Sequence, residues 1–323
     1  MIKHWYRRLL ELPARVSALP VVRRVLAWSK RRSLPGFFGV PVYDVLVFAY
    51  RESESDLVMR ANSMAFSFFL ALFPSLLALL SIVPTIQAVF LPAGPDLLQT
   101  LEREVLRVLP GPAGTVLFET INELNEQSPA LFSVGTLFAF WFASNGVMSM
   151  MRGFEKTELK FYKRRKLLRK RLLALLLTLQ SGAALLAAVI LIIQLNLSIA
   201  YVAEYVRATG VLSALLSLAG WTVIFLLFYG IISSLYRFVP ATTHRTGWLS
   251  PGATFATLGS ILISVGFTLY VNNFDTYNKL YGSIGAVIAT LLWLQFNSFV
   301  LLVGYELNAA IAVNRADQNP GTP

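Results

Sequence analysis

The chain has no cysteine, only two histidines and few charged residues for its length. Without cysteine, disulfides, thiolate nucleophiles and cysteine-ligated metal sites are all excluded. The two histidines, His4 and His244, are too few for a histidine-based metal or acid–base cluster within one chain. Charged residues make up 14% of the 323 residues, whereas soluble chains carry roughly a quarter. Together with a hydrophobic content of 56%, this composition excludes an ordinary soluble domain.

Long uncharged stretches dominate the rest of the sequence. A membrane-spanning helix needs about 20 apolar residues, and six stretches are long enough. Their apolar character is continuous, which favours helices over the alternating strands of a barrel. Pro74 and Pro84 predict a kinked or broken first helix. The sequence therefore predicts an all-α integral membrane protein whose six-transmembrane-helix bundle occupies residues 61–314. The predicted spans are 61–90, 131–151, 172–200, 212–236, 253–271 and 284–313.

The distribution of Lys and Arg predicts the orientation. Eleven lie in residues 1–60 and ten in residues 152–171. Arg237, Arg245 and Arg315 bring that side of the membrane to 24 of the 28, and only four fall on the other side. The positive-inside rule therefore places both termini in the cytoplasm. Because this rule also accounts for the net charge of +11, we expect no nucleic-acid partner.

Two segments outside the spans are predicted to be helical. Residues 1–60 form a basic cytoplasmic arm that lacks the apolar region of a cleavable signal peptide. Their apolar residues predict amphipathic helices on the inner leaflet, with a solvated basic tail as the alternative. The extracytoplasmic loop 91–130 has two apolar stripes at helical spacing, one on either side of Pro110-Gly111-Pro112. We expect a helical hairpin there, either a packed cap or a lid over a cavity. Residues 315–323 form a cytoplasmic tail.

Three motifs carry a resemblance to a known family. The first runs from Arg60 to Leu77, and the second is Trp141-Phe142-Ala143-Ser144-Asn145-Gly146-Val147. The third lies between Tyr281 and Ala309 and includes Gly304-Tyr305-Glu306-Leu307-Asn308. Together they resemble the YihY/BrkB family over about residues 45–312. The resemblance implies a six-helix protein of the bacterial inner (plasma) membrane. It also implies a link to serum resistance and to export phenotypes of the envelope or lipopolysaccharide.

Members of that family have also carried the name ribonuclease BN, but the residues of this chain argue against such an activity. A metal-dependent nuclease needs clustered histidine and carboxylate ligands in an aqueous site, whereas His4 and His244 fall in separate cytoplasmic segments. An intramembrane hydrolase is disfavoured because no histidine or cysteine lies within the spans to activate a nucleophile. We therefore expect no enzyme, no cofactor and no metal.

Glu306 is the only charged residue inside the predicted spans, which makes it the first candidate for a functional group. The alternative is a structural acid that holds helices together through an ion pair or hydrogen bonds. Counted at about 1.5 Å per helical residue, its depth below the cytoplasmic edge is roughly 10 Å. The polar side chains at nearly the same level are Ser67, Ser144, Asn145, Thr178 and Gln180.

This polar layer predicts either a vestibule open to the cytoplasm or interhelical hydrogen bonding. Gln295 lies about three turns from Glu306, so the two share one face of the last span. Asn297, Gly304 and Asn308 share nearly the opposite face, which places that span in the bundle centre. A stripe of mostly small residues in the fifth span predicts a close-packing seam. Its members are Gly252, Ala256, Gly259, Ile263 and Gly266.

Three arginines, Arg60, Arg152 and Arg237, stand at the cytoplasmic ends of the spans. They are expected either to reach towards the membrane–water interface or to grip an anionic lipid headgroup. One of them, or Asn145, is also the predicted partner of Glu306, because a carboxylate at membrane depth needs a polar partner.

Two functions follow from these features. The first is a transporter or flippase for a lipid or other anionic amphiphile of the cell envelope. It rests on the family resemblance, on the polar layer beneath a basic rim and on the proline-containing first span. The alternative is a non-transporting envelope scaffold that acts through partners. The phospholipid bilayer is a partner in both, and the first adds an anionic lipid or lipid-linked substrate. No nucleotide-binding motif is present, so a gradient or a partner would have to drive transport.

Overall fold

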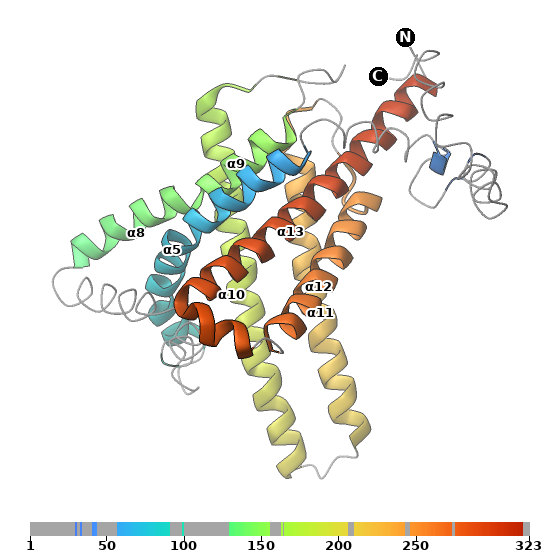
Figure 1. The fold of residues 1–323 in the computed structure, drawn as a ribbon. Coiled ribbons are helices and arrows are strands. Elements are labelled where there is room, and N and C mark those ends of the chain that lie inside the picture. Colours follow the sequence, from blue (N-terminus) through green and yellow to red (C-terminus); the bar gives the residue numbers. More distant parts are fainter. Residues whose placement is uncertain are drawn as a thin grey trace.

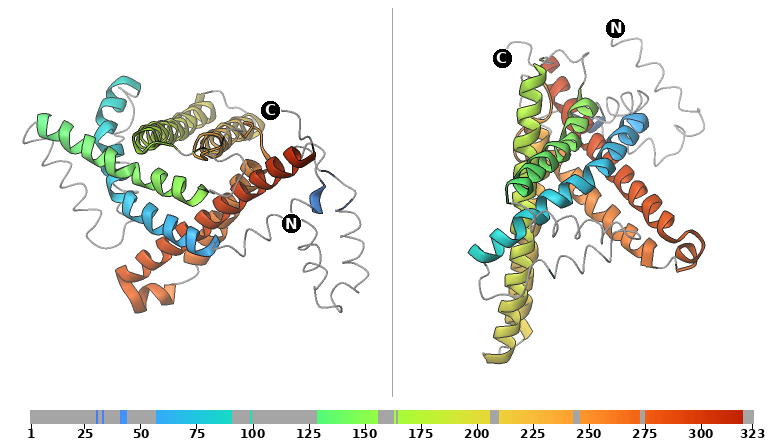
Figure 2. Two further views of the ribbon diagram at one scale, coloured as in Figure 1. Left: turned by 90° about the horizontal axis from the view of Figure 1, so that it is seen from above. Right: turned by 90° about the vertical axis from the view of Figure 1, so that its left-hand side faces the viewer.

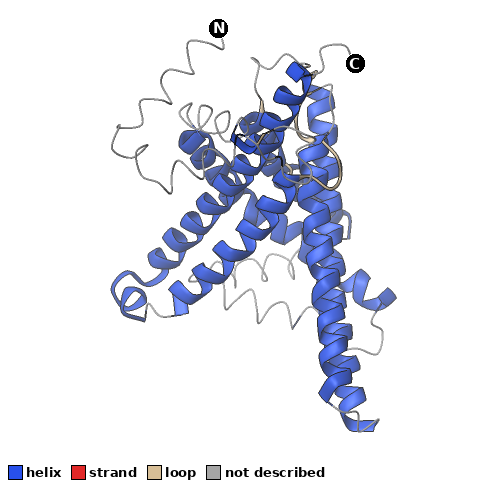
Figure 3. Cartoon of the chain, turned by 90° about the vertical axis from the view of Figure 1, so that its right-hand side faces the viewer, coloured by secondary structure: helices blue, strands red, loops and turns tan. Residues whose placement is uncertain are grey.

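The computed structural model describes residues 57–90, 129–155, 163, 165–205, 210–242, 246–272 and 275–318, with residues 30, 33, 41–43 and 99. All elements in this part of the chain are α-helices (Figures 1 and 3). Six candidate spans are long and apolar enough to cross a membrane, which confirms an all-helical membrane fold. The helices are α5 (Leu57–Phe90), α8 (Pro129–Ala143), α9 (Asn145–Phe154), α10 (Leu167–Tyr205), α11 (Gly210–Phe238), α12 (Pro251–Asn272) and α13 (Asp275–Gln318).

The helices contain the predicted spans, with differences in continuity. The first span, α5, is one uninterrupted helix despite Pro74 and Pro84, although its axis changes direction along its length (Figure 1). The second span is the one that is interrupted, because Ser144 separates α8 from α9. Apart from single residues and its edges, the predicted hairpin 91–130 lies outside the described residues, and so does most of the arm 1–60.

The spans meet at one end of the bundle. The buried core there combines the start of α5, α10 and α12 with the end of α9, α11 and α13. Successive spans therefore run in opposite directions, and the start of the first lies beside the end of the last. We call this end the basic end, because Arg60, Arg152, Arg165, Arg237 and Arg315 lie at it. Seen along α10 and α11, the other helices are strongly inclined to that pair (Figure 2).

Large apolar side chains cover the outside of the helices. Leu218 and Trp221 of α11 are 65% and 64% exposed, and Leu262 of α12 is 71% exposed. Exposing such faces to water is unfavourable, because burying one large apolar side chain stabilises a protein by about 1.5–3 kcal/mol. A lipid environment removes this cost, because hydrocarbon is as apolar as leucine. The helices α10 and α11 run side by side and extend beyond the others (Figures 1 and 3).

Close backbone approach joins α12 to α13. A Cβ atom added to Gly252 would lie 2.0 Å from the carbonyl oxygen of Gly304, and one added to Gly259 would lie 2.8 Å from Val300 Cγ1. These positions confirm the predicted seam over its first half. At Gly266 an added Cβ would meet nothing within 4 Å, so the seam does not extend that far. On its other side α13 packs against α5, which places it centrally in the bundle.

Candidate functional site

The acid singled out by the sequence is buried at the basic end. Glu306 is 1% exposed, and its Oε1 lies 3.1 Å from Nη1 of Arg60. The side chain of Arg60 is 21% exposed, so the pair is closed on the carboxylate side and partly open on the arginine side. The two residues come from the first and the last span, 246 positions apart. Of the partners that the sequence allowed for Glu306, the structure has Arg60.

Arg60 also binds the end of the second span. Its Nε donates a hydrogen bond of 2.8 Å to the carbonyl oxygen of Gly153, and its Nη2 donates to the same oxygen. Gly153 lies in the last turn of α9, where unsatisfied carbonyl groups give the helix a negative end that favours a cation. A Cβ atom at Gly153 would lie 2.5 Å from Sδ of Met64. The glycine thus lets α9 approach α5 closely enough for this bond.

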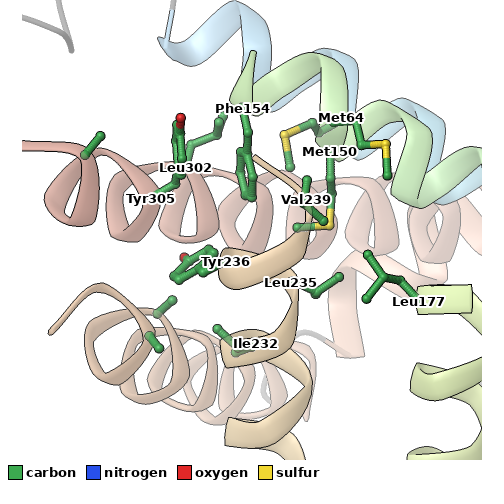
Figure 4. Close-up of a cluster of buried hydrophobic side chains, with 14 of the residues drawn as sticks. Met64, Met150, Phe154, Leu177, Ile232, Leu235, Tyr236, Val239, Leu302 and Tyr305 are labelled. Atoms are coloured by element: carbon green, nitrogen blue, oxygen red, sulfur yellow. The ribbon is translucent and has the colours of Figure 1, made fainter. Parts of the chain in front are cut away.

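Three aromatic rings of the buried core come from positions next to Gly153 and Glu306 in the chain and from the end of α11. Phe154 stacks on Tyr305 with ring centroids 4.5 Å apart, and it meets Tyr236 at 5.8 Å. Figure 4 shows these three rings beside Leu302 and Val239, with Met64 and Met150 next to them. The hydroxyl of Tyr236 donates a 2.7 Å hydrogen bond to the carbonyl oxygen of Leu301. The low polarity of this packing strengthens the attraction between the two charges.

A second polar cluster holds the interruption between α8 and α9. The hydroxyl of Ser144 donates 2.7 Å to the carbonyl oxygen of Trp141. Arg171 of α10 donates to that same oxygen at 2.6 Å and to Oδ1 of Asn145 at 2.7 Å. Its guanidinium carbon lies 3.8 Å from the centroid of the Trp141 ring. We call Trp141, Ser144, Asn145 and Arg171 the hinge cluster.

The remaining predicted layer does not gather around Glu306. Ser67 and Thr178 each donate to the carbonyl four residues earlier in their own helix. Gln180 of α10 donates to the hydroxyl of Ser234 of α11 at 2.9 Å. Gln295 is partly exposed on α13, three turns away from Glu306. Of the two interpretations of this layer, the contacts at Gln180 and Asn145 are of the interhelical hydrogen-bonding kind.

The other two candidate arginines lie apart from the carboxylate. Arg152 is exposed at the end of α9. Arg237 donates to the carbonyl oxygen of Thr246 at 2.9 Å, and its guanidinium carbon lies 5.4 Å from the centroid of the Trp248 ring.

Asn308 forms a further polar contact between the last two spans. Its Oδ1 accepts a 2.9 Å hydrogen bond from the backbone N–H of Gly252, and its Nδ2 donates to Ser250 Oγ at 3.1 Å. Ser250 Oγ also accepts from the backbone N–H of Ala253 at 3.2 Å. The first turn of α12 is therefore capped from α13 as well as by its own serine.

Arg171 is the residue that the sequence analysis missed. The candidate span of α10 is Leu167–Leu191, so it includes this arginine. The candidate span Leu57–Leu79 likewise includes Arg60. The helices extend further towards the basic end than the predicted spans, so the candidate spans carry Arg60, Arg152, Arg171 and Arg237 besides Glu306. The adjoining run of lysines and arginines hid the signal, since it made Arg171 look like the end of a loop.

The chemistry open to this site is that of exchangeable ionic partners. Inside the bundle the carboxylate and the guanidinium neutralise each other. When they separate, the carboxylate can accept from another cation and the guanidinium can donate to another anion. In the described part of the chain, no three His, Cys, Asp or Glu side chains come together as a metal ion would require.

Comparison with known proteins gives a family and several relatives. Residues 48–323 match the family model described as Virulence factor BrkB. The chain is 28% identical over 268 residues to the Putative ribonuclease-like protein YfkH of Bacillus subtilis (strain 168), covering 81% of this chain and 93% of that protein. It is 33% identical over 86 residues to a UPF0761 membrane protein of Pseudoalteromonas translucida (strain TAC 125), covering 27% of this chain and 29% of the relative. No solved structure matches the chain.

Proposed function

Because the chain belongs to the BrkB family of membrane proteins, and because a buried ion pair closes its basic end, we propose that it moves a lipid or other anionic amphiphile of the cell envelope across the bilayer. The membrane is the bacterial inner membrane in this proposal, with the basic end at the cytoplasmic face. The Arg60–Glu306 pair is the observation that carries it.

The proposed mechanism uses the competition between two anions for one guanidinium. In the closed arrangement Glu306 neutralises Arg60. An anionic headgroup that reaches Arg60, whose side chain is 21% exposed, can replace the carboxylate. Displacing the carboxylate removes this partner from the buried Glu306, and a buried charge that loses its partner destabilises the packing around it. Exchange of partners at this pair would thus couple headgroup binding to a change in helix packing.

The second candidate is a non-transporting envelope scaffold. The burial of Glu306, at 1%, is the observation that favours it, because a buried carboxylate held by an arginine is also what a purely structural ion pair looks like. The ribonuclease-like name of the Bacillus relative is not carried over to this chain. Two histidines in separate segments do not supply the clustered ligands of a metal-dependent nuclease.

Reconstitution distinguishes the two candidates. The purified protein is placed in vesicles that contain phosphatidylglycerol with a fluorescent headgroup, and an impermeant reductant reports the fraction that changes leaflet. We expect transfer above that of protein-free vesicles, abolished by Glu306→Gln. Glu155→Gln is the matched control, because Glu155 pairs with Lys170 outside the core, and it is expected to transfer at the wild-type rate.

A charge-free variant separates stability from transport. Replacing both partners of a buried pair by apolar residues is often neutral for stability. Arg60→Met/Glu306→Leu is therefore expected to fold and to remain inactive. Wild-type protein that transfers no more lipid than empty vesicles would reject transport of this lipid class. A double variant that is both folded and fully active would remove the ion pair from the mechanism.

A further inference from the structure

Arg171, the cation of the hinge cluster, has different partners from Arg60, the cation in the core. Arg60 is neutralised by Glu306, whereas the partners of Arg171 are a carbonyl oxygen, an amide oxygen and an aromatic ring. None of the carboxylates in the described residues is paired with Arg171. Two of its five N–H donors are accounted for by these bonds, and Nε is buried without a partner in the described part of the chain. Among the described residues, the positive charge of Arg171 therefore has no carboxylate partner.

The surroundings of Arg171 are exposed and largely apolar. Trp141 on one side of the cluster is 48% exposed, and Leu168 and Leu172, which flank Arg171 on α10, are 71% and 54% exposed. Asn145 is exposed as well. Arg171 lies about one turn from the start of α10, a depth from which an arginine reaches the phosphate layer. A cation with exposed apolar side chains around it fits a lipid, because a lipid has both a negative headgroup and acyl chains. A free inorganic anion has no acyl chains to contact these side chains.

We propose that the hinge cluster is a binding site for an anionic phospholipid of the leaflet at the basic end. The headgroup phosphate accepts from the remaining N–H groups on Nη1 and Nη2 of Arg171 and from the amide of Asn145, and the acyl chains lie along Trp141 and the exposed leucines of α10. The site is separate from the Arg60–Glu306 pair and does not depend on transport. Its occupant compensates the charge that holds the interruption between α8 and α9, so lipid composition would adjust the stability of that joint.

Quenching of Trp141 by brominated lipids tests this directly. The protein is reconstituted in phosphatidylcholine vesicles in which a fixed minor fraction carries brominated acyl chains, either as phosphatidylglycerol or as phosphatidylcholine. The contribution of Trp141 is the difference between wild type and Trp141→Phe. We expect phosphatidylglycerol to be preferred by about fivefold, the factor that corresponds to roughly 1 kcal/mol for one cation near an anionic surface.

Variants of the cation assign the preference to Arg171. Arg171→Gln is expected to reduce the ratio to about one, and Arg171→Lys to keep it within roughly twofold, because the charge persists although the bidentate geometry is lost. Arg169→Gln, two residues earlier and exposed on the same helix, is expected to leave the ratio unchanged.

Thermal stability is measured in parallel for each variant, so that unfolding is not mistaken for lost selectivity. Equal quenching by the two lipids in the wild type would overturn the proposal. So would a folded Arg171→Gln variant that retains the preference, since Arg171 would then only fasten the joint.

Discussion

At the scale of single residues, the stability of the bundle depends on the Arg60–Glu306 pair, and the cost of removing one partner depends on how buried the pair is. Removing one partner of a fully buried pair destabilises a protein by about 3–5 kcal/mol. The cost here is smaller, because the Arg60 side chain retains 21% of its exposure and also binds the carbonyl oxygen of Gly153. The pair thus joins the first and the last span, and its removal is expected to cost less than that of a fully buried pair.

Among the described glycines, Gly252 is the one at which an added Cβ atom would meet the closest backbone atom. A Cβ atom there would lie 2.0 Å from a backbone oxygen, which cannot rotate away, and 2.6 Å from Cγ of Asn308. We expect Gly252→Ala to separate α12 from α13 and to lower the free energy of unfolding by about 1–3 kcal/mol. The measurement is the midpoint of thermal unfolding in detergent.

Gly266→Ala is the matched control for that prediction. It lies on the same helix and in the same sequence stripe, but its added Cβ meets nothing within 4 Å. Because alanine has the higher helix propensity, this variant is expected to be as stable as wild type or slightly more stable. Equal losses in the two variants would mean that helix flexibility, and not contact, explains the glycines.

At the scale of whole elements, arginines fasten the helix ends that arrive at the basic end. The carbonyl oxygen of Trp141 near the end of α8 accepts from Arg171, and that of Gly153 at the end of α9 accepts from Arg60. Arg165 donates to the carbonyl oxygens of Phe238, Val239 and Pro240, where α11 ends. In each case the cation comes from a different part of the chain, so capping and tertiary packing are one interaction.

Arg165→Gln is expected to loosen the end of α11. Three carbonyl oxygens would lose a charge-assisted donor, each in a partly buried position. We expect a loss of about 1–3 kcal/mol in the free energy of unfolding and faster amide hydrogen exchange in the last turn of α11. Lys166→Gln, an exposed neighbour, is expected to change neither. An unchanged exchange rate in Arg165→Gln would show that α11 ends stably without it.

The sequence predicted the helices better than the contacts between them and the interruptions within them. Hydropathy locates six spans because each carries its own apolar signal, and a lone acid such as Glu306 is visible for the same reason. The identity of its partner was not predictable, since Arg60, Arg152 and Arg237 all stand at span ends and only packing selects one. A kink or a break was expected at the prolines of α5, and the axis of that helix does change direction (Figure 1). The break lies instead at Ser144, where a cation from α10 satisfies the carbonyl oxygen of Trp141. Because that contact joins residues far apart in the sequence, the helix propensity of the residues around Ser144 does not predict it.

At the scale of the whole molecule, the orientation remains a prediction with a direct test. The chain has no cysteine, so single cysteines report their own exposure. An impermeant thiol reagent added to intact cells is expected to label Glu123→Cys and to miss Lys166→Cys, because 24 of the 28 Lys and Arg residues lie on the side of Lys166. Disrupting the cells should make Lys166→Cys reactive. Labelling of Lys166→Cys alone in intact cells would reverse the proposed orientation.

The 246-residue separation between Arg60 and Glu306 has a consequence for biosynthesis. The first span leaves the ribosome and enters the membrane long before its acidic partner has been translated. Until α13 is inserted, Arg60 lacks that counter-charge, and Gly252 of α12 lacks the surface against which it packs. A nascent chain that stops before the last span therefore displays an unneutralised arginine and an open glycine face within the bilayer.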